Sequence, residues 1–258
     1  MPIAAGLYYF AHGADEAARP PVILIHGAGG HHLYWPPQVR RLHNQRVFAV
    51  DLPGHGKSAG VGHHTIEDYA SETMQFLKAL KLNRAVLVGH SMGGAVALQA
   101  ALEHPKRVIG LVLIGSAARL RVNPTLLQLS SDPAKAEDVV QTVIDLSFGE
   151  NANARLKELA GQRMLETRPS VLHGDLLACN SFDVAAGTDK IAAPTLLIFG
   201  EHDRMVSPRN GQNLRDQIPG ARLELVPDAG HMVMLEQPDG VATLLADFIN
   251  NIAYRPGR

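Results

Sequence analysis

Short runs of apolar residues recur along the chain without alternating with polar residues. Five of these runs are rich in valine, isoleucine and leucine, and they span 22–27, 46–51, 84–90, 107–115 and 195–200. Such runs are typical of strands that are covered on both faces, as in a parallel sheet. A further run, 222–227, alternates between apolar and polar residues and therefore predicts a strand nearer the edge of the sheet.

Amphipathic segments separate these runs. In residues 65–80, apolar side chains recur every three or four positions, which predicts a helix capped by Thr65, with Asp68 three residues further on. Residues 93–104 have a strongly helical composition that ends at Pro105, and 237–252 predict a closing helix. This alternation of strands and helices predicts an α/β fold with a mostly parallel, doubly wound sheet.

One long stretch breaks the alternation. From about 118 to 189 the sequence predicts helices and no buried strand, and strand-like residues resume only at Thr195. We therefore expect a helical insertion at 118–189 within a core domain formed by 1–117 and 190–258. Most of its apolar residues must form its own core, but some are candidates for lining an apolar pocket: Leu126, Leu127, Leu129, Val139, Val143, Ile144, Leu172, Leu176 and Leu177.

Composition narrows the range of partners and compartments. The 258 residues are 46% hydrophobic and 19% charged, which indicates a globular protein with a sizeable core. The formal net charge of −1, without a long run of one sign, argues against nucleic acid or an anionic membrane surface as the main partner. Cys179 is the single cysteine, so no intrachain disulfide can form. We recognise no signal peptide and no membrane-spanning stretch, and we expect a cytoplasmic protein.

The chain places a serine between two glycines where a predicted strand meets a predicted helix. The sequence Gly89-His90-Ser91-Met92-Gly93 matches the pattern G-x-S-x-G, a sharp strand-to-helix turn that exposes a nucleophilic hydroxyl. The alternative is an ordinary glycine-rich turn, which needs neither the preceding strand nor the following helix. The context therefore favours Ser91 as a nucleophile.

A serine nucleophile needs a base and an acid that orients the base. His231 lies between the last predicted strand and the last predicted helix, in a loop that can return a side chain toward Ser91. Asp203 follows the strand that ends at Gly200 and lies far enough into its loop to reach His231. Glu201 is interpreted as structural, and Asp228 is the rival acid.

Two backbone N–H groups must face the developing oxyanion. We expect one from Met92 and one from the loop 26–30, where Ala28 is the first choice and Gly29 the second. Glycines in this loop let a substrate approach the main chain, so Gly29 is also a candidate for substrate binding. Trp35 is read equally well as a border of the pocket or as the anchor of a helix that starts at the following prolines.

The histidine pairs His31–His32 and His63–His64 raise the question of a metal site. No acidic or cysteine cluster at ligand spacing accompanies them in the sequence, so we interpret them as solvated loop residues. His26 and His55 are expected to order the backbone. Neither a P-loop lysine nor a dinucleotide-binding glycine motif is present, and no metal or organic cofactor is expected.

These segments together resemble the α/β-hydrolase superfamily, and within it the serine carboxylesterase-like members with a helical cap. The matching motifs are VILIHGAGG, DLPGHGKS, VGHSMGG, PTLLIFGEHDRMVSP and DAGHMVMLEQP, which run in the expected order and leave out only the insertion. The resemblance implies a cap, or lid, at 118–189. Some members carry the acid one strand earlier, at a position that here lies within 114–120 and has no carboxylate, which favours Asp203.

The resemblance also narrows the activity. Dehalogenases and epoxide hydrolases of this fold carry aspartate where this chain has Ser91, and HGGG-type esterases differ from it in the loop 26–30. We expect hydrolysis of a small-molecule carboxylic ester with a short to medium acyl chain, through an acyl-enzyme on Ser91. A lactonase or a C–C bond hydrolase could use the same groups, with Arg119, Arg121 and Arg168 as cationic candidates unless these are solvated helix charges. Cofactor-free peroxidase-type activity and a small-ligand receptor are the non-hydrolytic alternatives, and the oligomeric state stays open.

Overall fold

A mostly parallel sheet forms the centre of the protein in a computed structural model that describes residues 2–13 and 19–254. Its strand order within these residues is β1-β2-β4-β3-β5-β6-β7-β8. Strands β3 to β8 pair in parallel, and β1 and β2 are antiparallel to their neighbours. The strands are β1 (Ile3–Ala4), β2 (Leu7–His12), β3 (Val22–Ile25), β4 (Val47–Val50), β5 (Ala85–His90), β6 (Val108–Ile114), β7 (Thr195–Gly200) and β8 (Arg222–Val226). The predicted α/β fold with a doubly wound sheet is confirmed.

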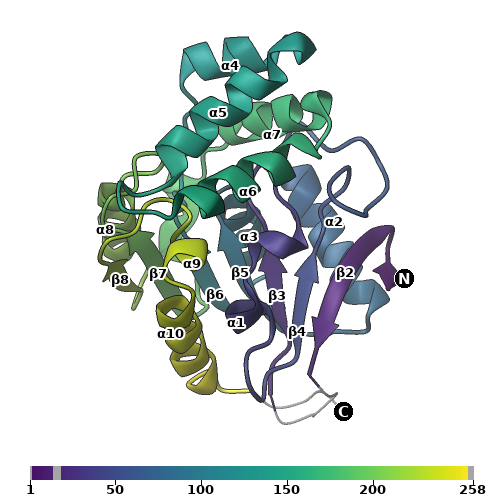
Figure 1. The fold of residues 1–258 in the computed structure, drawn as a ribbon. Coiled ribbons are helices and arrows are strands. Elements are labelled where there is room, and N and C mark those ends of the chain that lie inside the picture. Colours follow the sequence, from purple (N-terminus) through teal and green to yellow (C-terminus); the bar gives the residue numbers. More distant parts are fainter. Residues whose placement is uncertain (1, 14–18, 255–258) are drawn as a thin grey trace.

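Helices cover both faces of this sheet (Figure 1). In β3, Ile23 and Ile25 belong to one hydrophobic core, and Val22 and Leu24 belong to the core on the opposite face. This is the reason why the strand sequences do not alternate. The first core contains residues of α2 (Ile66–Ala79), α3 (Met92–Glu103) and α8 (Pro208–Gln217), and the second contains residues of α1 (Pro37–Arg40), α9 (Val233–Glu236) and α10 (Pro238–Asn250).

The edges of the sheet differ from its centre. Strand β8 lies at one edge, as its alternating sequence predicts, and it is mostly exposed or half-buried. Strands β1 and β2 form the other edge and were not predicted from the sequence. Only Leu7 of β2 is fully buried, so this strand lacks the continuous apolar run that identifies the central strands.

The predicted helix boundaries follow local capping. The Thr65 hydroxyl oxygen accepts a hydrogen bond from the Asp68 amide and so caps α2. Helix α3 ends at Glu103, two residues before Pro105. The closing helix α10 starts one residue later and ends two residues earlier than predicted, because Pro238 occupies its first position.

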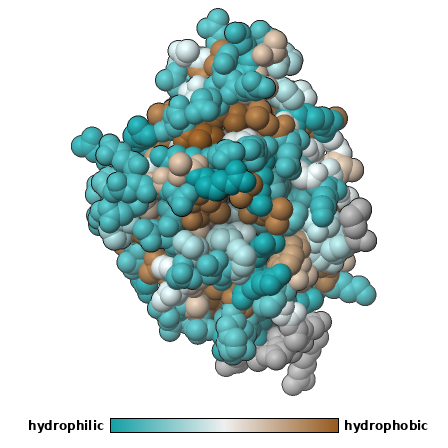
Figure 2. Space-filling view, viewed as in Figure 1, coloured by the Kyte–Doolittle hydropathy of each residue, from teal (hydrophilic) through white to brown (hydrophobic). Residues whose placement is uncertain are grey.

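Helices also fill the stretch between β6 and β7. They are α4 (Pro124–Ser130), α5 (Ala136–Ser147), α6 (Ala154–Leu165) and α7 (Pro169–Ser181), and we call them the insert helices. Short 3-10 turns lie at Pro133–Lys135 and Ala185–Lys190, and another, His32–Tyr34, lies in the loop after β3. Figure 1 shows the insert helices gathered over one end of the sheet, and Figure 2 shows hydrophobic surface among them. No helix in the described part of the chain is long and apolar enough to cross a membrane.

Candidate active site

Ser91 lies at the turn between β5 and α3, as predicted. Its backbone has φ 52° and ψ −117°, a left-handed conformation that a residue with a side chain rarely adopts. Strand β5 and helix α3 meet at this residue, and the Gly94 and Ala95 amides both donate hydrogen bonds to its carbonyl oxygen. The turn therefore presents the Ser91 side chain at the end of the sheet in a strained, fixed conformation.

The glycines around Ser91 are required by close backbone contacts. A Cβ atom on Gly89 would lie 2.0 Å from the Gly93 carbonyl oxygen, and one on Gly93 would lie 2.2 Å from the Ile25 carbonyl oxygen. A Cβ atom on Gly27 would approach Ser91 Cβ to 3.2 Å, so the loop after β3 packs directly against the turn. Any larger residue at Gly89 or Gly93 would force the backbone of the turn apart, and one at Gly27 would crowd the side chains of His90 and Ser91.

Asp203 and His231 form a hydrogen-bonded pair. Asp203 Oδ2 lies 2.8 Å from His231 Nδ1, and both residues are buried. Asp203 Oδ1 accepts hydrogen bonds from the amides of Met205 and Val206 at 2.9 and 2.8 Å, which fix the carboxylate. An ionised carboxylate only accepts hydrogen bonds, so His231 Nδ1 carries the proton. His231 Nε2 is then free to act as a base.

The rival acids lie elsewhere. Asp228 and Glu201 are both exposed, and they line a polar hollow on the outer side of Asp203 that includes neither Ser91 nor His231. This hollow is larger than the cavity at Ser91, but no histidine-aspartate pair faces its one serine, Ser207, whose hydroxyl caps α8 by accepting a hydrogen bond from the Arg209 amide. The segment 114–120, considered for an acid one strand earlier, instead contributes Gly115 beside the pair: a Cβ atom there would be 3.0 Å from His231 Nδ1.

Ser91 and His231 line one mainly apolar cavity together with Ala28. It is bounded by Gly27, Ala28, Tyr34, His90, Ser91, Val143, Ser147, Met164, Leu172, Leu176, Met205, His231 and Met232. Three of the nine apolar candidates from the insertion, Val143, Leu172 and Leu176, are among them. Among the described residues that line it, none is an aspartate, glutamate, lysine or arginine. The cavity thus favours uncharged groups.

Of the two predicted oxyanion donors, Ala28 lines this cavity, and Met92 directly follows Ser91, which lines it. Met92 is the first residue of α3, where helix geometry leaves the amide without an intrahelical acceptor. Ala28 lines the cavity from the loop after β3. The Gly29 amide, the second choice, donates instead to Asp175 Oδ2 at 2.8 Å. Gly29 is also absent from the cavity lining. Leu172 and Met164, which do line the cavity, pack against it, since a Cβ atom on Gly29 would lie 3.0 Å from Leu172 and 3.1 Å from Met164.

Trp35 does not reach the cavity. Its side chain is completely buried in the hydrophobic core that contains α1 and α10. Pro36 is the N-cap of α1, and Pro37 is its first residue. The structure therefore places Trp35 as the anchor at the start of a helix and not as a border of the pocket.

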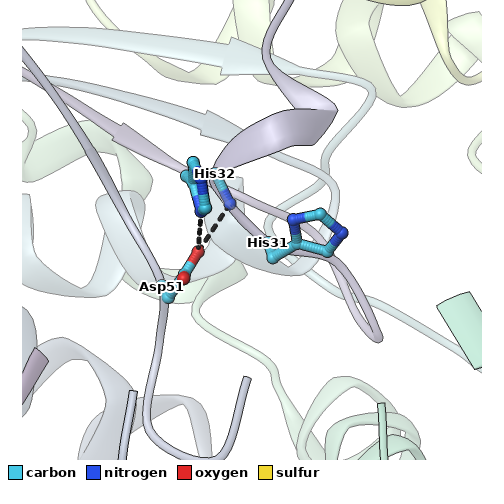
Figure 3. A group of neighbouring side chains, drawn as sticks. All are labelled: His31, His32 and Asp51. Carbon is cyan, nitrogen blue, oxygen red and sulfur yellow. Dashed lines mark hydrogen bonds and ion pairs between the residues drawn. The ribbon is translucent and has the colours of Figure 1, made fainter. Parts of the chain in front are cut away.

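The expectation that His31 and His32 are solvated is wrong. Both are buried, and together with Asp51 they offer metal-ligand atoms within 4.8 Å of one another (Figure 3). Asp51 Oδ1 already accepts hydrogen bonds from the His32 amide and the His32 ring, and Oδ2 accepts one from the Lys57 amide. These bonds order the loop after β3, and they already occupy both lone pairs of Asp51 Oδ1. His64 is exposed and His63 is half-buried.

His26 and His55 order the backbone, as predicted. His26 Nε2 accepts a hydrogen bond from the Leu52 amide, so its Nδ1 carries the proton and donates to the Gly27 carbonyl oxygen. Burial and the neighbouring His55 lower the pKa of His26 to about 3. His55 contacts the Pro53 carbonyl oxygen and also Asp175 of α7, a link that was not predicted.

The arginines considered as binders of an acidic substrate lie on the surface. Arg119 and Arg121 both pair with Asp183, and Arg168 donates to the Gly60 carbonyl oxygen. None of the three lines the cavity at Ser91. Sequence reasoning missed Asp175, whose only signal in the sequence is an aspartate within the mainly apolar stretch 171–179, which also holds His173.

Comparison with known proteins decides the family. The family model described as "Alpha/beta hydrolase family" matches residues 22–244. The chain belongs to the α/β hydrolase family. It is 28% identical to a protein of Caulobacter sp. (strain K31) named for carbamate hydrolysis, RutD, over 96% of this chain and 97% of that protein. It is 30% identical to a pimeloyl-[acyl-carrier protein] methyl ester esterase of Neisseria meningitidis, over 91% of this chain and 78% of the esterase.

A solved structure agrees with this family. The crystal structure of the enol-lactonase from Burkholderia xenovorans LB400 superposes with a TM-score of 0.89 at 26% identity, covering 95% of this chain and 96% of that one. The α/β hydrolase fold therefore extends over the insert helices as well as the sheet. The protein is a hydrolase of this family, and its relatives include an esterase and an enol-lactonase.

Proposed function

We propose that the protein hydrolyses carboxylic esters, with Ser91 as nucleophile, His231 as general base and Asp203 as the acid that orients His231. The observation that carries this proposal is the shared cavity of Ser91 and His231, with the His231–Asp203 pair behind it. The strained backbone of Ser91 supports the same role, because it holds the hydroxyl at the end of the sheet.

In the first half of the reaction, His231 Nε2 takes the proton from the Ser91 hydroxyl while the oxygen attacks the ester carbonyl carbon. The C=O electron pair moves onto oxygen, and the amides of Ala28 and Met92 stabilise this oxyanion. Asp203 stabilises the imidazolium through Nδ1. Collapse of the intermediate breaks the C–O bond to the alcohol, which takes the proton from His231 and leaves an acyl-enzyme.

Water completes the reaction on the same groups. His231 removes a proton from a water molecule that attacks the acyl carbon, and the oxyanion again faces the Ala28 and Met92 amides. Collapse returns the proton to Ser91 and releases the carboxylic acid. No cofactor enters this cycle.

The cavity supports a small, uncharged acyl group. Val143, Leu172 and Leu176 present apolar side chains from α5 and α7, while lysine and arginine are absent from its described lining. A carboxylate on the acyl chain would be left without a counter-charge there. We propose short to medium acyl chains, and we propose that residues 118–189 act as the cap above a core of 1–117 and 190–258.

A lactonase is the second candidate, because an enol-lactonase structure superposes over nearly the whole chain. Ring opening would use the same steps, except that the leaving oxygen stays part of the acyl group, so that water cleaves the bond to Ser91 and releases one molecule that carries both the carboxylic acid and the former leaving oxygen. The surface positions of Arg119, Arg121 and Arg168 disfavour a C–C hydrolase that must hold a dienolic acid.

Hydrolysis of p-nitrophenyl butyrate by the wild type and by Ser91→Ala tests the proposal, with folding checked by circular dichroism. We expect turnover by the wild type and a fall of about 10³-fold or more in the variant. Wild-type activity that survives in Ser91→Ala would exclude Ser91 as the nucleophile. A parallel series of aliphatic lactones and a phenyl carbamate separates the ester assignment from lactone and carbamate hydrolysis.

A further inference from the structure

Asp175 is a fully buried carboxylate on helix α7 that the proposed reaction does not use. Its Oδ2 atom accepts hydrogen bonds from the Gly29 amide and from His55 Nε2, both at 2.8 Å. Its Oδ1 atom accepts a hydrogen bond of 2.6 Å from the Tyr69 hydroxyl. A buried charge needs such partners, and here three different segments of the core supply them.

His55 supplies the positive charge that balances Asp175. Its Nδ1 atom lies 3.0 Å from the Pro53 carbonyl oxygen and its Nε2 atom lies 2.8 Å from Asp175. Both neighbours only accept hydrogen bonds, so both ring nitrogens must carry protons, and His55 is an imidazolium. Burial alone would lower the pKa of His55, but the Asp175 carboxylate outweighs it and raises the pKa.

The third partner of Asp175 belongs to the loop that carries Ala28. Gly29 adopts φ +62° and is held on both sides by the insertion: its amide donates to Asp175, and its carbonyl oxygen accepts a hydrogen bond of 3.0 Å from Thr167 Oγ1. Ala28 is the residue immediately before it and lines the cavity with Ser91. The peptide that follows Ala28 is thus fixed by α7 and by the turn that precedes it.

We propose that Asp175 is a positioning residue that fixes the oxyanion loop 27–30 through the Gly29 amide, so that the insertion completes the site formed by the core. The expected effect of Asp175 on the reaction rate rests on the proposed ester hydrolysis, whereas its anchoring of the loop is independent of that proposal. Asp175 touches neither Ser91 nor the cavity, so it acts only through the position of the loop.

Asp175→Asn tests the role with little change in shape, because it removes the charge that holds His55 and weakens the acceptor for Gly29. Tyr69→Phe is the matched control: it removes a hydrogen bond to the same carboxylate and the one that the Tyr69 hydroxyl accepts from the His63 amide, but it leaves the bonds from Gly29 and His55 to Asp175 in place. Thr167→Val removes only the bond to the Gly29 carbonyl oxygen and serves as a milder second variant if Asp175→Asn does not fold.

Hydrogen–deuterium exchange of peptides covering 26–34 reports on the loop without any substrate. In Asp175→Asn we expect faster exchange in these peptides, while peptides from β7 and α10 stay as protected as in the wild type. Steady-state kinetics should show kcat lowered by about 10- to 100-fold and KM changed by less than about threefold, because one misplaced oxyanion donor costs mainly transition-state binding. Tyr69→Phe should keep kcat within about threefold of the wild type.

Unchanged exchange in 26–34, or loosened exchange with an unchanged kcat, overturns the positioning role. Equal loss of protection across the whole chain also overturns it, because Asp175 would then act on global stability alone. A wild type that hydrolyses no ester, lactone or carbamate while Asp175→Asn still loosens 26–34 overturns the proposed function and supports the anchor. For Thr167→Val we expect the same pattern of exchange with a smaller effect on kcat.

Discussion

The His90 ring donates a hydrogen bond from Nε2 to the backbone carbonyl oxygen of His231, 3.0 Å away. A carbonyl oxygen only accepts, so Nε2 carries the proton. Burial, followed by the neighbouring His231, lowers the pKa of His90 well below its ordinary value and keeps the ring neutral. The residue before the proposed nucleophile thus holds the main chain of the proposed base.

Replacing His90 by phenylalanine should therefore impair catalysis without emptying the core. We expect kcat to fall by about 10- to 100-fold with a small change in KM, because a small shift of the base relative to the nucleophile is costly. Ester hydrolysis and thermal unfolding are measured on the same samples. His43→Phe, on the exposed surface, is the control, and an unaltered kcat in His90→Phe would show that the His231 loop keeps its position without this bond.

Asp203 and Asp228 lie on the same outer hollow, but only Asp203 contacts His231. Asp203→Asn should lower kcat by about 10² to 10⁴, because the amide favours the wrong tautomer of the histidine. Asp228→Asn should stay within about twofold of the wild type, because its exposed side chain faces solvent. The reverse order of effects would identify Asp228 as the acid.

Local patterns explain most of what the sequence predicted. Unbroken apolar runs identify β3 to β7 because these strands are buried on both faces, and the close approach of Gly89 and Gly93 explains the motif around Ser91. Strand β2 was missed because its residues are only partly buried at the edge of the sheet. Its antiparallel pairing with β4 forms the strand, although its sequence lacks an unbroken apolar run.

Long-range contacts account for what the sequence could not predict. The buried state of His31 and His32 depends on Asp51, which lies about twenty positions later and reaches them only through the pairing of β3 with β4. Asp175 lies 146 positions from Gly29. Hydrogen bonds of this kind arise from tertiary packing, which no periodicity or spacing of residues encodes.

Three buried neutral histidines predict a loss of stability in acid. Burial lowers the pKa of His26 to about 3 and that of His31 to about 4, and it also holds the pKa of His90 low, against 6.5 for an ordinary histidine. Between about pH 4 and 6.5 the unfolded chain then binds more protons than the folded chain, so the free energy of unfolding falls as pH falls. In this range each of these histidines lowers the free energy of unfolding by about 1.4 kcal/mol for each pH unit of acidification.

His55 has the opposite sign. Its pKa is raised in the folded protein, so its contribution to stability is complete below about pH 6.5 and is lost as the pH rises through the folded pKa. Urea unfolding from pH 4.5 to 9 should therefore show a maximum near neutral pH. His31→Gln should reduce the slope of the free energy of unfolding against pH on the acid side, by the amount that corresponds to about one proton. A free energy of unfolding that stays constant from pH 5 to 6.5 would contradict this account.

Met164 and Leu172 separate the cavity at Ser91 from a groove on the insertion, since both residues line both spaces. Met164→Ala should join the two and lengthen the space for an acyl chain. We expect kcat/KM for p-nitrophenyl octanoate to rise about tenfold relative to butyrate, in line with what a few extra methylenes contribute in an apolar pocket. Loss of the buried side chain should cost about 2–5 kcal/mol of stability, so the assay is run well below the unfolding temperature.

Leu165→Ala is the matched control for Met164→Ala, because Leu165 lines the groove but not the cavity and is 45% exposed. It should leave the ratio of octanoate to butyrate hydrolysis unchanged. An equal shift in both variants would mean that the acyl chain enters from the groove side and that Met164 forms no barrier. An unchanged ratio in both would place the acyl chain elsewhere, against Val143 and Leu176, where Val143→Phe should then abolish hydrolysis of the longer ester while retaining that of acetate.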